Sequence, residues 1–353
     1  MNLGIYDQDC QYHCVGSRVF TRAKNGANTA ELMFEMIQKF PNMIPKLHSI
    51  ISDQAAYQLA ANRQLSRMLG KDLQQLTCSL HTVSNGDGEF NGRLPLAEQA
   101  VHCSKMLYGC RQSWEHSNSS LRNELEIGLL IEEGRRFSPF KNDRGSRFAV
   151  GYRNAMSLIK YRDLVLRTLD TPRARKISYA SKLKQLLTVN WTQTCLQLGC
   201  YIIHWLLVLN PFYAAMGQTI ELGSGKAFAR ELKDKYQLLL DSSNQLETML
   251  EFINADTIAE YPCLTVVTQM WRTCEVSERE EVNSVLQAAV ERAGRKIMKD
   301  TQLVLDLTGE RGDLLPFSNN RVESHFSLIK VNARYSSLVV TYDFSIFTCG
   351  LLL

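Results

Sequence analysis

The sequence lacks long apolar runs, short repeats and a strong charge of either sign. Its longest apolar run, residues 201–209, contains His204 and ends before Asn210, well short of the roughly 20 residues that cross a bilayer. We therefore expect a buried helix there and no membrane contact. Twenty glycines, eight prolines and no regular period exclude collagen-like and solenoid proteins. The net charge of +4, from 40 Lys and Arg against 36 Asp and Glu, does not by itself indicate a polyanionic partner.

Clustered cysteines and the common catalytic fingerprints are also missing. Ten cysteines are spread thinly over 353 residues, which is typical of reduced, intracellular thiols rather than of a disulfide framework. The first ten residues contain no basic stretch followed by a long apolar run, so secretion is not expected. P-loop, dinucleotide-binding, nucleophile-elbow and zincin motifs do not occur, so the enzyme classes that they mark have no support.

Patterns along the chain change character near Gly92. Before this residue, the sequence predicts a strand hairpin and then helix, strand, helix and strand, over 2–22, 29–40, 47–51, 54–70 and 76–83. After a loop at 84–89, helical patterns occupy 97–116, 119–136, 150–169, 180–209, 225–253 and 276–300. A last short helix is expected around residues 322–326. The tail from Val339 is interpreted either as a strand or as a sequence foreign to the rest.

Asp53 follows residues 47–51 (LHSII), a short apolar run that is typical of a buried strand. A carboxylate at the end of a buried strand is held rigidly and can bind a hard divalent cation, because Mg²⁺ prefers oxygen ligands. Asp53 can instead cap the amino terminus of the helix that follows. The pattern leaves both roles open.

Cys78 and His81 form a C-x-x-H pair, which is half of a tetrahedral zinc site. Two further ligands would have to come from His102 and Cys103 or from the first 14 residues, and no second pair at ligand spacing supports this. We therefore favour a structural role for the pair, packed at the end of a strand.

The strongest concentration of charge lies in residues 135–184, which hold 14 Lys and Arg against three Asp. Such a segment can neutralise phosphates and attract a polyanion, with most contacts to the backbone rather than to bases. The alternative is a solvated helix face whose counter-charges lie elsewhere.

Glu323 lies in the predicted C-terminal helix, beside the apolar positions Val322, Phe326 and either Leu328 or Ile329. A glutamate on the surface of a helix is unremarkable by itself. Only the context of this residue can assign it a function.

Four segments, taken in their order and spacing, resemble the hAT family of DNA transposases. They are residues 49–86 with the strand-end Asp and the C-x-x-H pair, 143–158 (DRGSRFAVGYRNAMSL), 205–219 (WLLVLNPFYAAMGQT) and 316–330 (PFSNNRVESHFSLIK). The second is similar to the family's Arg-aromatic segment, the third to its leucine-rich stretch ending in Pro-Phe-Tyr, and the fourth to its C-terminal signature around Glu. The likeness spans roughly residues 1–338.

The resemblance implies an α/β fold, in which an RNase H-like mixed sheet is interrupted by a large all-helical insertion domain. The corresponding domains are the N-terminal part of the RNase H-like domain, the insertion, the C-terminal helix that completes the first domain, and an atypical tail. Their predicted ranges are 1–92, 93–312, 313–338 and 339–353. Dimerisation through the C-terminal helix is also implied.

The resemblance further implies a DDE mechanism, in which three carboxylates hold two Mg²⁺ or Mn²⁺ ions for an in-line attack on a phosphodiester. Asp53 would be the second acid and Glu323 the third, each serving as a metal ligand and a catalytic residue. Cys78 and His81 would form a structural motif.

DNA is the partner that the resemblance implies, and four basic residues are the candidates for its contacts: Arg144, Arg147, Arg153 and Lys160. Of these, Arg144 and Arg147 are expected to lie nearest the acidic site.

The first acid of the DDE set is missing from its expected place. In the family's fold it lies on an opening strand that precedes a hairpin of two more strands, whereas only about two strands precede Thr29 here. Asp7 is the available substitute, but it falls in the predicted hairpin turn. We therefore expect a truncated, catalytically impaired relic of a two-metal strand-transfer enzyme. An active nuclease that uses Asp7 is a further hypothesis.

The leading functional hypothesis is thus a transposase-derived, DNA-binding protein of the nucleus, which forms a homo-oligomer and uses Mg²⁺ or Mn²⁺ only where activity remains. The alternative is a helical protein-interaction scaffold, in which the acids are helix caps and the basic helices bind proteins. An affinity for duplex DNA that falls steeply with salt would separate the two hypotheses.

Overall fold

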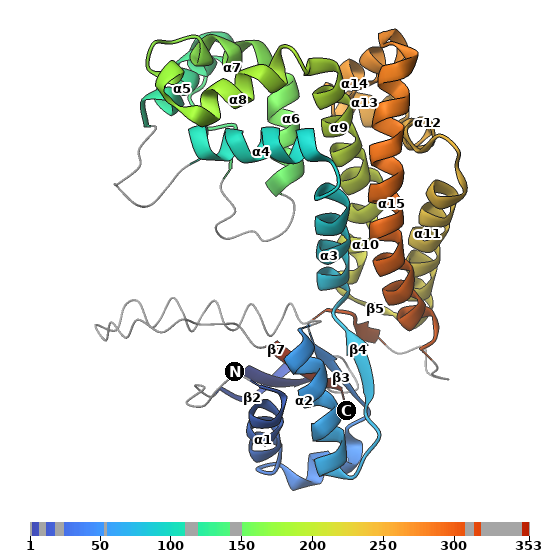
Figure 1. The fold of residues 1–353 in the computed structure, drawn as a ribbon. Helices are drawn as coiled ribbons and strands as arrows, with labels where there is room; N and C mark the ends of the chain where they lie inside the picture. Colours follow the sequence, from blue (N-terminus) through green and yellow to red (C-terminus); the bar gives the residue numbers. More distant parts are fainter. Residues whose placement is uncertain are drawn as a thin grey trace. The chain divides into compact units, whose positions relative to one another are not determined.

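The computed structural model describes residues 2–6, 12–17, 25–52, 55–109, 119–141, 150–307, 314–318 and 348–352, and most of them are helical (Figure 1). The chain forms two compact units. Unit 1 comprises Met1–Val83, Pro211–Lys233 and Ile297–Leu353, and unit 2 comprises Ser84–Asn210 and Asp234–Lys296. The domain ranges that the sequence analysis gives, with boundaries at 92, 312 and 338, are drawn differently and stay predictions.

The α-helices in the described residues are α1 (Gly26–Ile37), α2 (Ala56–Leu69), α3 (Ser79–Asn91), α4 (Pro95–Tyr108), α5 (Ser119–Glu133), α6 (Val150–Lys160), α7 (Arg162–Leu169), α8 (Ser178–Leu187), α9 (Trp191–Ile203), α10 (Asn210–Met216), α11 (Leu222–Asp241), α12 (Gln245–Glu251), α13 (Ala255–Glu260), α14 (Cys263–Thr273) and α15 (Val276–Leu305). Two 3-10 helices, η1 (Pro41–Lys46) and η3 (Ala174–Lys176), and a π-helix, η4 (His204–Leu209), complete the helical part. Helices α11 and α15 each contain residues of both units.

Five short strands form the sheet of unit 1 in the order β2-β1-β7-β3-β4. They are β1 (Asn2–Tyr6), β2 (Tyr12–Ser17), β3 (Ser49–Ser52), β4 (Gln74–Thr77) and β7 (Thr348–Leu352). The β1–β2 and β7–β3 pairs are antiparallel, and the β1–β7 and β3–β4 pairs are parallel. A separate antiparallel pair joins β5 (Thr219–Glu221) to β6 (Leu314–Pro316). The predicted hairpin and the predicted strand before Asp53 are therefore confirmed.

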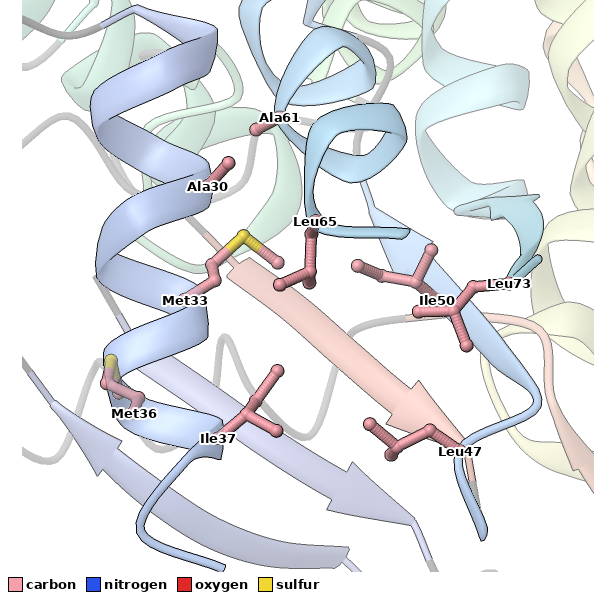
Figure 2. Close-up of a cluster of buried hydrophobic side chains, with 9 residues drawn as sticks. All are labelled: Ala30, Met33, Met36, Ile37, Leu47, Ile50, Ala61, Leu65 and Leu73. Atoms are coloured by element: carbon pink, nitrogen blue, oxygen red, sulfur yellow. The ribbon is translucent and has the colours of Figure 1, made fainter. Parts of the chain in front are cut away.

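The core of unit 1 is a cluster of apolar side chains between α1, α2 and β3. Asn25 caps α1 by accepting a hydrogen bond at Oδ1 from the amide of Asn28 (2.9 Å). Figure 2 shows the buried side chains of the cluster, which come from both helices, from β3 and from the residues before β3 and β4: Ala30, Met33, Met36, Ile37, Leu47, Ile50, Ala61, Leu65 and Leu73. Each fully buried Leu, Ile or Met in such a cluster stabilises the fold by about 1.5–3 kcal/mol.

The core of unit 2 is built around α9, which is buried on nearly all sides. Its Gln197 side chain accepts a hydrogen bond from the amide of Leu96 (2.9 Å), one of the unpaired donors at the start of α4. Gly199 lets α14 approach closely, because a Cβ there would lie 2.3 Å from Cγ1 of Val267. The predicted buried helix around residues 201–209 is confirmed, although residues 204–209 adopt the π form.

The prediction of an RNase H-like α/β fold is wrong. Most of the described residues are helical, and the strands are short. The place between the hairpin and β3 is taken by β7, which comes from the far end of the chain and runs antiparallel to β3. Strands β3 and β4 have only four residues each. The described chain is therefore predominantly helical and contains no RNase H-like mixed sheet.

The prediction for the residues that follow β4 is also wrong. Residues 76–83 were expected to form a strand and 84–89 a loop, whereas the strand ends at Thr77 and α3 runs through both segments. Leu80, Val83 and Phe90 are all buried and recur at helical spacing. Burial of this apolar face outweighs the weak helix propensity of the two glycines between Val83 and Phe90.

Candidate functional site

A small pocket lies in unit 1 at the C-terminal ends of β3 and β4. Its polar lining consists of Thr77, Ser79, Thr82 and Asp300, and the other lining residues are apolar: Ile51, Leu76, Phe212, Leu303, Val304, Leu307 and Phe317. The pocket has about 20 Å³ of space for a water-sized particle, which is enough for roughly one water molecule. It is too small for a substrate.

Two consecutive amides connect the segments around this pocket. The amide of Cys78 donates to the carbonyl of Ser52 at the end of β3, and the amide of Ser79 donates to the carbonyl of Phe317, each over 2.9 Å. The hydroxyl of Ser79 is buried and has no hydrogen-bond partner in the described chain. Asp300, which is 7% exposed, also lines the pocket. A single water molecule fits these polar groups.

The two predicted catalytic acids, Asp53 and Glu323, lie outside the residues that the structure describes. The same is true of Asp7, the proposed substitute for the first acid. Within the described ranges, no group of three or more His, Cys, Asp and Glu side chains could hold a metal ion. The two-metal site and its Mg²⁺ or Mn²⁺ ions therefore stay predictions.

Cys78 and His81 lie at the junction between β4 and α3. Cys78 follows the strand and is a buried free thiol, and His81 lies half-buried in the first turn of the helix. The structural role that the sequence analysis favours for the pair stays a prediction.

Of the four residues that were predicted to contact nucleic acid, the structure describes two. Arg144 and Arg147 lie outside the described residues. Arg153 is exposed on α6, where its Nε donates to the hydroxyl of Tyr152 (3.3 Å). Lys160 is exposed but bound within unit 2, because its Nζ donates to Glu133 Oε1 (2.7 Å) and to the hydroxyl of Tyr161 (2.8 Å).

The bonds of Lys160 change the acidity of both charged partners. Its hydrogen bond to Glu133 raises the pKa of Lys160, and the same bond lowers the pKa of Glu133. A cation that already neutralises an internal carboxylate gains little from a phosphate. Lys160 is therefore a weaker candidate for a nucleic-acid contact than its exposure suggests.

Five of the ten other described cations of residues 135–184 are also held by acids. Ion pairs join Arg135 to Glu133, Arg136 to Glu126, Arg162 to Asp163, Arg167 to Glu132 and Lys184 to Asp170. These pairs account for the counter-charges that the sequence analysis left open as the alternative to a phosphate-binding surface.

Lys141 and Arg153 make no ion pair with a described residue, and the same is true of four cations grouped around the start of α8. These four are exposed: Arg173, Arg175, Lys176 and Lys182. We call this group the α8 basic surface. These four residues belong to the predicted basic stretch but were not among the predicted nucleic-acid contacts. A detectable pattern was present, because residues 171–220 contain five Lys and Arg and no Asp or Glu.

A buried histidine lies in the interior of unit 2. His204 begins the π-helix, its Nδ1 lies 3.3 Å from Oδ1 of Asp87, and its Nε2 is hydrogen-bonded to the hydroxyl of Tyr236. The imidazole also stacks on Phe90, with ring centroids 3.7 Å apart. A neutral imidazole whose Nδ1–H donates to Asp87 and whose Nε2 accepts from Tyr236 satisfies every partner.

Burial determines the acidity of this group. It lowers the pKa of His204, against the opposing effect of Asp87. It raises the pKa of Tyr236 well above its usual value, and the charge of Asp87 adds to that effect. Both rings are fully buried. We therefore interpret the three residues as a structural network rather than as a catalytic triad.

Two apolar features of the described chain concern contact with a membrane or a partner. The continuous helical stretch Trp191–Met216 has 26 residues and is long and apolar enough to cross a membrane, but 83% of its most apolar window is buried inside the protein. On α5, Ile127, Leu130 and Ile131 are 49%, 45% and 78% exposed. Their spacing places them on one side of the helix, where they form an apolar stripe that we call the α5 stripe.

Comparisons with known proteins assign no family to this chain. Neither a family model, nor a curated protein, nor a solved structure matches this chain. The resemblance to hAT transposases therefore stays a prediction, and functional arguments rest on the residues that the structure describes.

Proposed function

We propose that unit 2 binds nucleic acid through the α8 basic surface. The observation that carries this proposal is the contrast between two sets of cations. Six of the twelve described cations of residues 135–184 are ion-paired. Four of the other six lie close together in the sequence, are exposed and make no ion pair with a described residue: Arg173, Arg175, Lys176 and Lys182. Cations without an internal counter-ion can approach phosphates and release the ions condensed around a nucleic acid.

The start of α8 adds a second favourable feature. No side chain caps this helix, and the amides of Ser178 and Tyr179 precede its first intrahelical bonds. Unpaired amides and the positive end of the helix dipole both favour an anion. The three cations 173, 175 and 176 lie immediately before these amides in the sequence. This arrangement is suited to phosphate groups and carries no base specificity.

The test is the binding of a labelled DNA duplex, followed by fluorescence anisotropy across a salt series. We expect the logarithm of the affinity to fall linearly with the logarithm of the salt concentration. Replacing Arg173, Arg175 and Lys176 with Gln should reduce the slope by up to about 3, because each phosphate contact contributes about 0.9.

A matched control removes the same charge elsewhere. Arg136, Arg167 and Arg292 are exposed and are ion-paired to Glu126, Glu132 and Glu89. Their replacement with Gln lowers the net charge equally but should leave the slope almost unchanged. Equal losses in both triple variants would show only a general charge effect and would contradict the proposal.

Several predictions of the sequence analysis stay open beside this proposal. They are the transposase ancestry, the nuclear location, the homo-oligomer and the Mg²⁺ or Mn²⁺ ions. We propose no strand-transfer chemistry, because the RNase H-like fold that it requires is not present and the two acids lie outside the described residues.

A protein-interaction scaffold is the second candidate function, and the α5 stripe is the observation that favours it. Three neighbouring exposed aliphatic side chains on one helix face are unusual for surface that contacts only water. If the duplex does not bind even at low salt, the scaffold becomes the better proposal. Replacement of Ile127 and Ile131 with Lys should then abolish partner binding without unfolding unit 2.

A further inference from the structure

An aromatic pair lies on the surface of unit 2 beside the α8 basic surface. His102 of α4 and Tyr179 of α8 meet edge to face, with ring centroids 5.7 Å apart and ring planes at 67°. His102 is exposed and Tyr179 is half-buried. Helices α4 and α8 pack against each other, and Figure 1 shows them side by side. The pair therefore presents ring surface to solvent rather than filling the core.

One cation lies near this pair on α8, and two others precede Tyr179 in the sequence. Lys182 lies three residues after Tyr179 and thus on the same side of α8. The charge of Lys182 lowers the pKa of the Cys103 thiol on α4, although burial raises that pKa more strongly. Lys182 is therefore close to α4 as well as to Tyr179. Arg175 and Lys176 precede Tyr179 by four and three residues.

This juxtaposition goes beyond what a duplex needs. A duplex presents its phosphates to a protein, but the faces of its bases are covered by stacking within the double helix. Positive charge is therefore enough to bind it, and an exposed aromatic ring adds nothing. Unpaired bases expose their faces, and proteins that bind single strands combine a cationic surface with aromatic rings on which the bases stack. Stacking of this kind tolerates any sequence, because every base has such a face.

We propose that the His102–Tyr179 pair and the cations near Tyr179 bind single-stranded nucleic acid. An unpaired base stacks on the exposed ring surface of the pair, and Arg175, Lys176 and Lys182 contact the flanking phosphates. This inference rests on the proposed function and specifies its ligand class. Both single-stranded DNA and single-stranded RNA have the required chemistry.

The experiment measures the affinity of the full chain for labelled oligonucleotides of about 16 nucleotides, the upper end of common single-strand sites. The ligands are a DNA strand, an RNA strand of the same sequence, the DNA duplex, and an abasic DNA strand that keeps the phosphates but has no bases. We expect the natural strands to bind at least about fivefold more tightly than the abasic strand. The DNA and RNA arms identify the preferred source.

Two substitutions at one position test the role of the ring. Tyr179→Leu keeps an apolar side chain of similar bulk but removes the aromatic face, so the preference for natural over abasic strands should disappear while duplex binding persists. Tyr179→Phe keeps the face and should retain the preference. Thermal unfolding of both variants checks that the packing of α8 against α4 survives.

The outcomes separate this inference from the proposed function. If the abasic strand binds wild-type protein as tightly as the natural strand, or if Tyr179→Leu matches wild type on every ligand, the single-strand inference fails and the phosphate-binding function stands. If no ligand binds even at low salt, both fail. A preference that Tyr179→Phe retains and Tyr179→Leu loses supports both.

Discussion

Asp87, His204 and Tyr236 form a hydrogen-bonded chain whose cost of disruption can be measured. Tyr236→Phe removes the hydroxyl that donates to Nε2 of His204 and leaves a buried nitrogen without a partner. We expect a loss of about 1–3 kcal/mol in the free energy of unfolding, because a buried unsatisfied polar group keeps its full desolvation penalty. Urea denaturation monitored by circular dichroism measures the change.

Tyr261→Phe is the matched control for this substitution. The Tyr261 hydroxyl donates to Oε1 of Glu260 (2.6 Å) at an exposed site, so its removal should change the stability by less than about 0.5 kcal/mol. If both variants lost the same free energy of unfolding, the buried hydrogen bond would contribute no more to stability than the exposed one.

His204 also makes the stability dependent on pH. Burial holds its pKa below the ordinary value of 6.5, so at acidic pH the unfolded chain binds a proton that the folded chain excludes. The contribution of this residue is complete above pH 6.5 and is lost as the pH falls below that value, at up to about 1.4 kcal/mol per pH unit. His204→Gln cannot titrate, and its unfolding free energy should decline less between about pH 7 and pH 5. Parallel declines would contradict the assignment.

The sequence alone predicted the basic stretch but not the partners of its individual residues. The basic stretch was visible from composition, but the sequence could not show that Lys160 would bond to Glu133 while the four cations of the α8 basic surface would make no ion pair with a described residue. Ion pairs between helices depend on tertiary packing, and charge counts contain no information about it. The aromatic partner of Tyr179 lies 77 positions away on α4 (179 − 102) and was missed for the same reason.

At the scale of helices and their ends, two glycines should respond in opposite directions to the same substitution. Gly70 ends α2 with φ +63°, in the left-handed region that disfavours residues with a Cβ. Gly88 lies inside α3 on its exposed side, and a Cβ there meets nothing within 4 Å.

We expect Gly70→Ala to lower the free energy of unfolding by about 1 kcal/mol through backbone strain. Gly88→Ala should raise it by about 0.5–1 kcal/mol, because alanine loses less backbone entropy in a helix. Chemical denaturation of the two variants and wild type, run in parallel, gives both values. A stabilising Gly70→Ala would show that α2 does not end at this turn in solution.

Secondary structure was predictable where an apolar period was strong. The helix before Pro41, the strand before Asp53 and the long helix from Val276 were all expected near their observed places. The prediction of a loop at residues 84–89 was wrong for a physical reason. These six residues are small or polar and are typical of a loop. Only the burial of Val83 and Phe90 on either side of them indicates that the whole segment is one helix. The π form of residues 204–209 gives no comparable periodic pattern.

For the molecule as a whole, thiol reactivity offers a probe of both units. Six cysteines of the described chain are free and buried: Cys78, Cys103, Cys195, Cys200, Cys263 and Cys274. Burial raises the pKa of Cys195 and Cys200 to about 12 and that of Cys263 to about 11. Because all six side chains are buried and inaccessible to the reagent, iodoacetamide at about pH 8 should modify none of these thiols in the folded protein, as peptide mass spectrometry will show. The raised pKa of Cys195, Cys200 and Cys263 protects these three further, since the thiolate is the reactive form.

Labelling at increasing urea concentration should also reveal how the units unfold. Cys78 belongs to unit 1 and Cys200 to unit 2. Because α11 and α15 each contain residues of both units, unfolding of either unit breaks helices of the other. We expect the two thiols to become reactive with the same urea midpoint. Two separate midpoints would show that the units unfold independently.

The fold of the whole chain was the least predictable level. Two β-forming segments, a following helix and a largely helical remainder were correctly expected, but the inference of an RNase H-like sheet relied on a family pattern rather than on pairing. The strand that lies between β1 and β3 is β7, which is nearly three hundred residues away from β3 along the chain. Local periodicity contains no information about such a partner.

The position of β7 has a consequence for biosynthesis. Strands β1 and β3 emerge early from the ribosome, yet the segment that hydrogen-bonds to both of them is Thr348–Leu352. At typical translation rates of about 5–20 residues per second, their backbone edges wait for roughly 15–60 seconds before the pairing partner is made. During that interval the unpaired edges of these strands are open to pairing with strands of other chains.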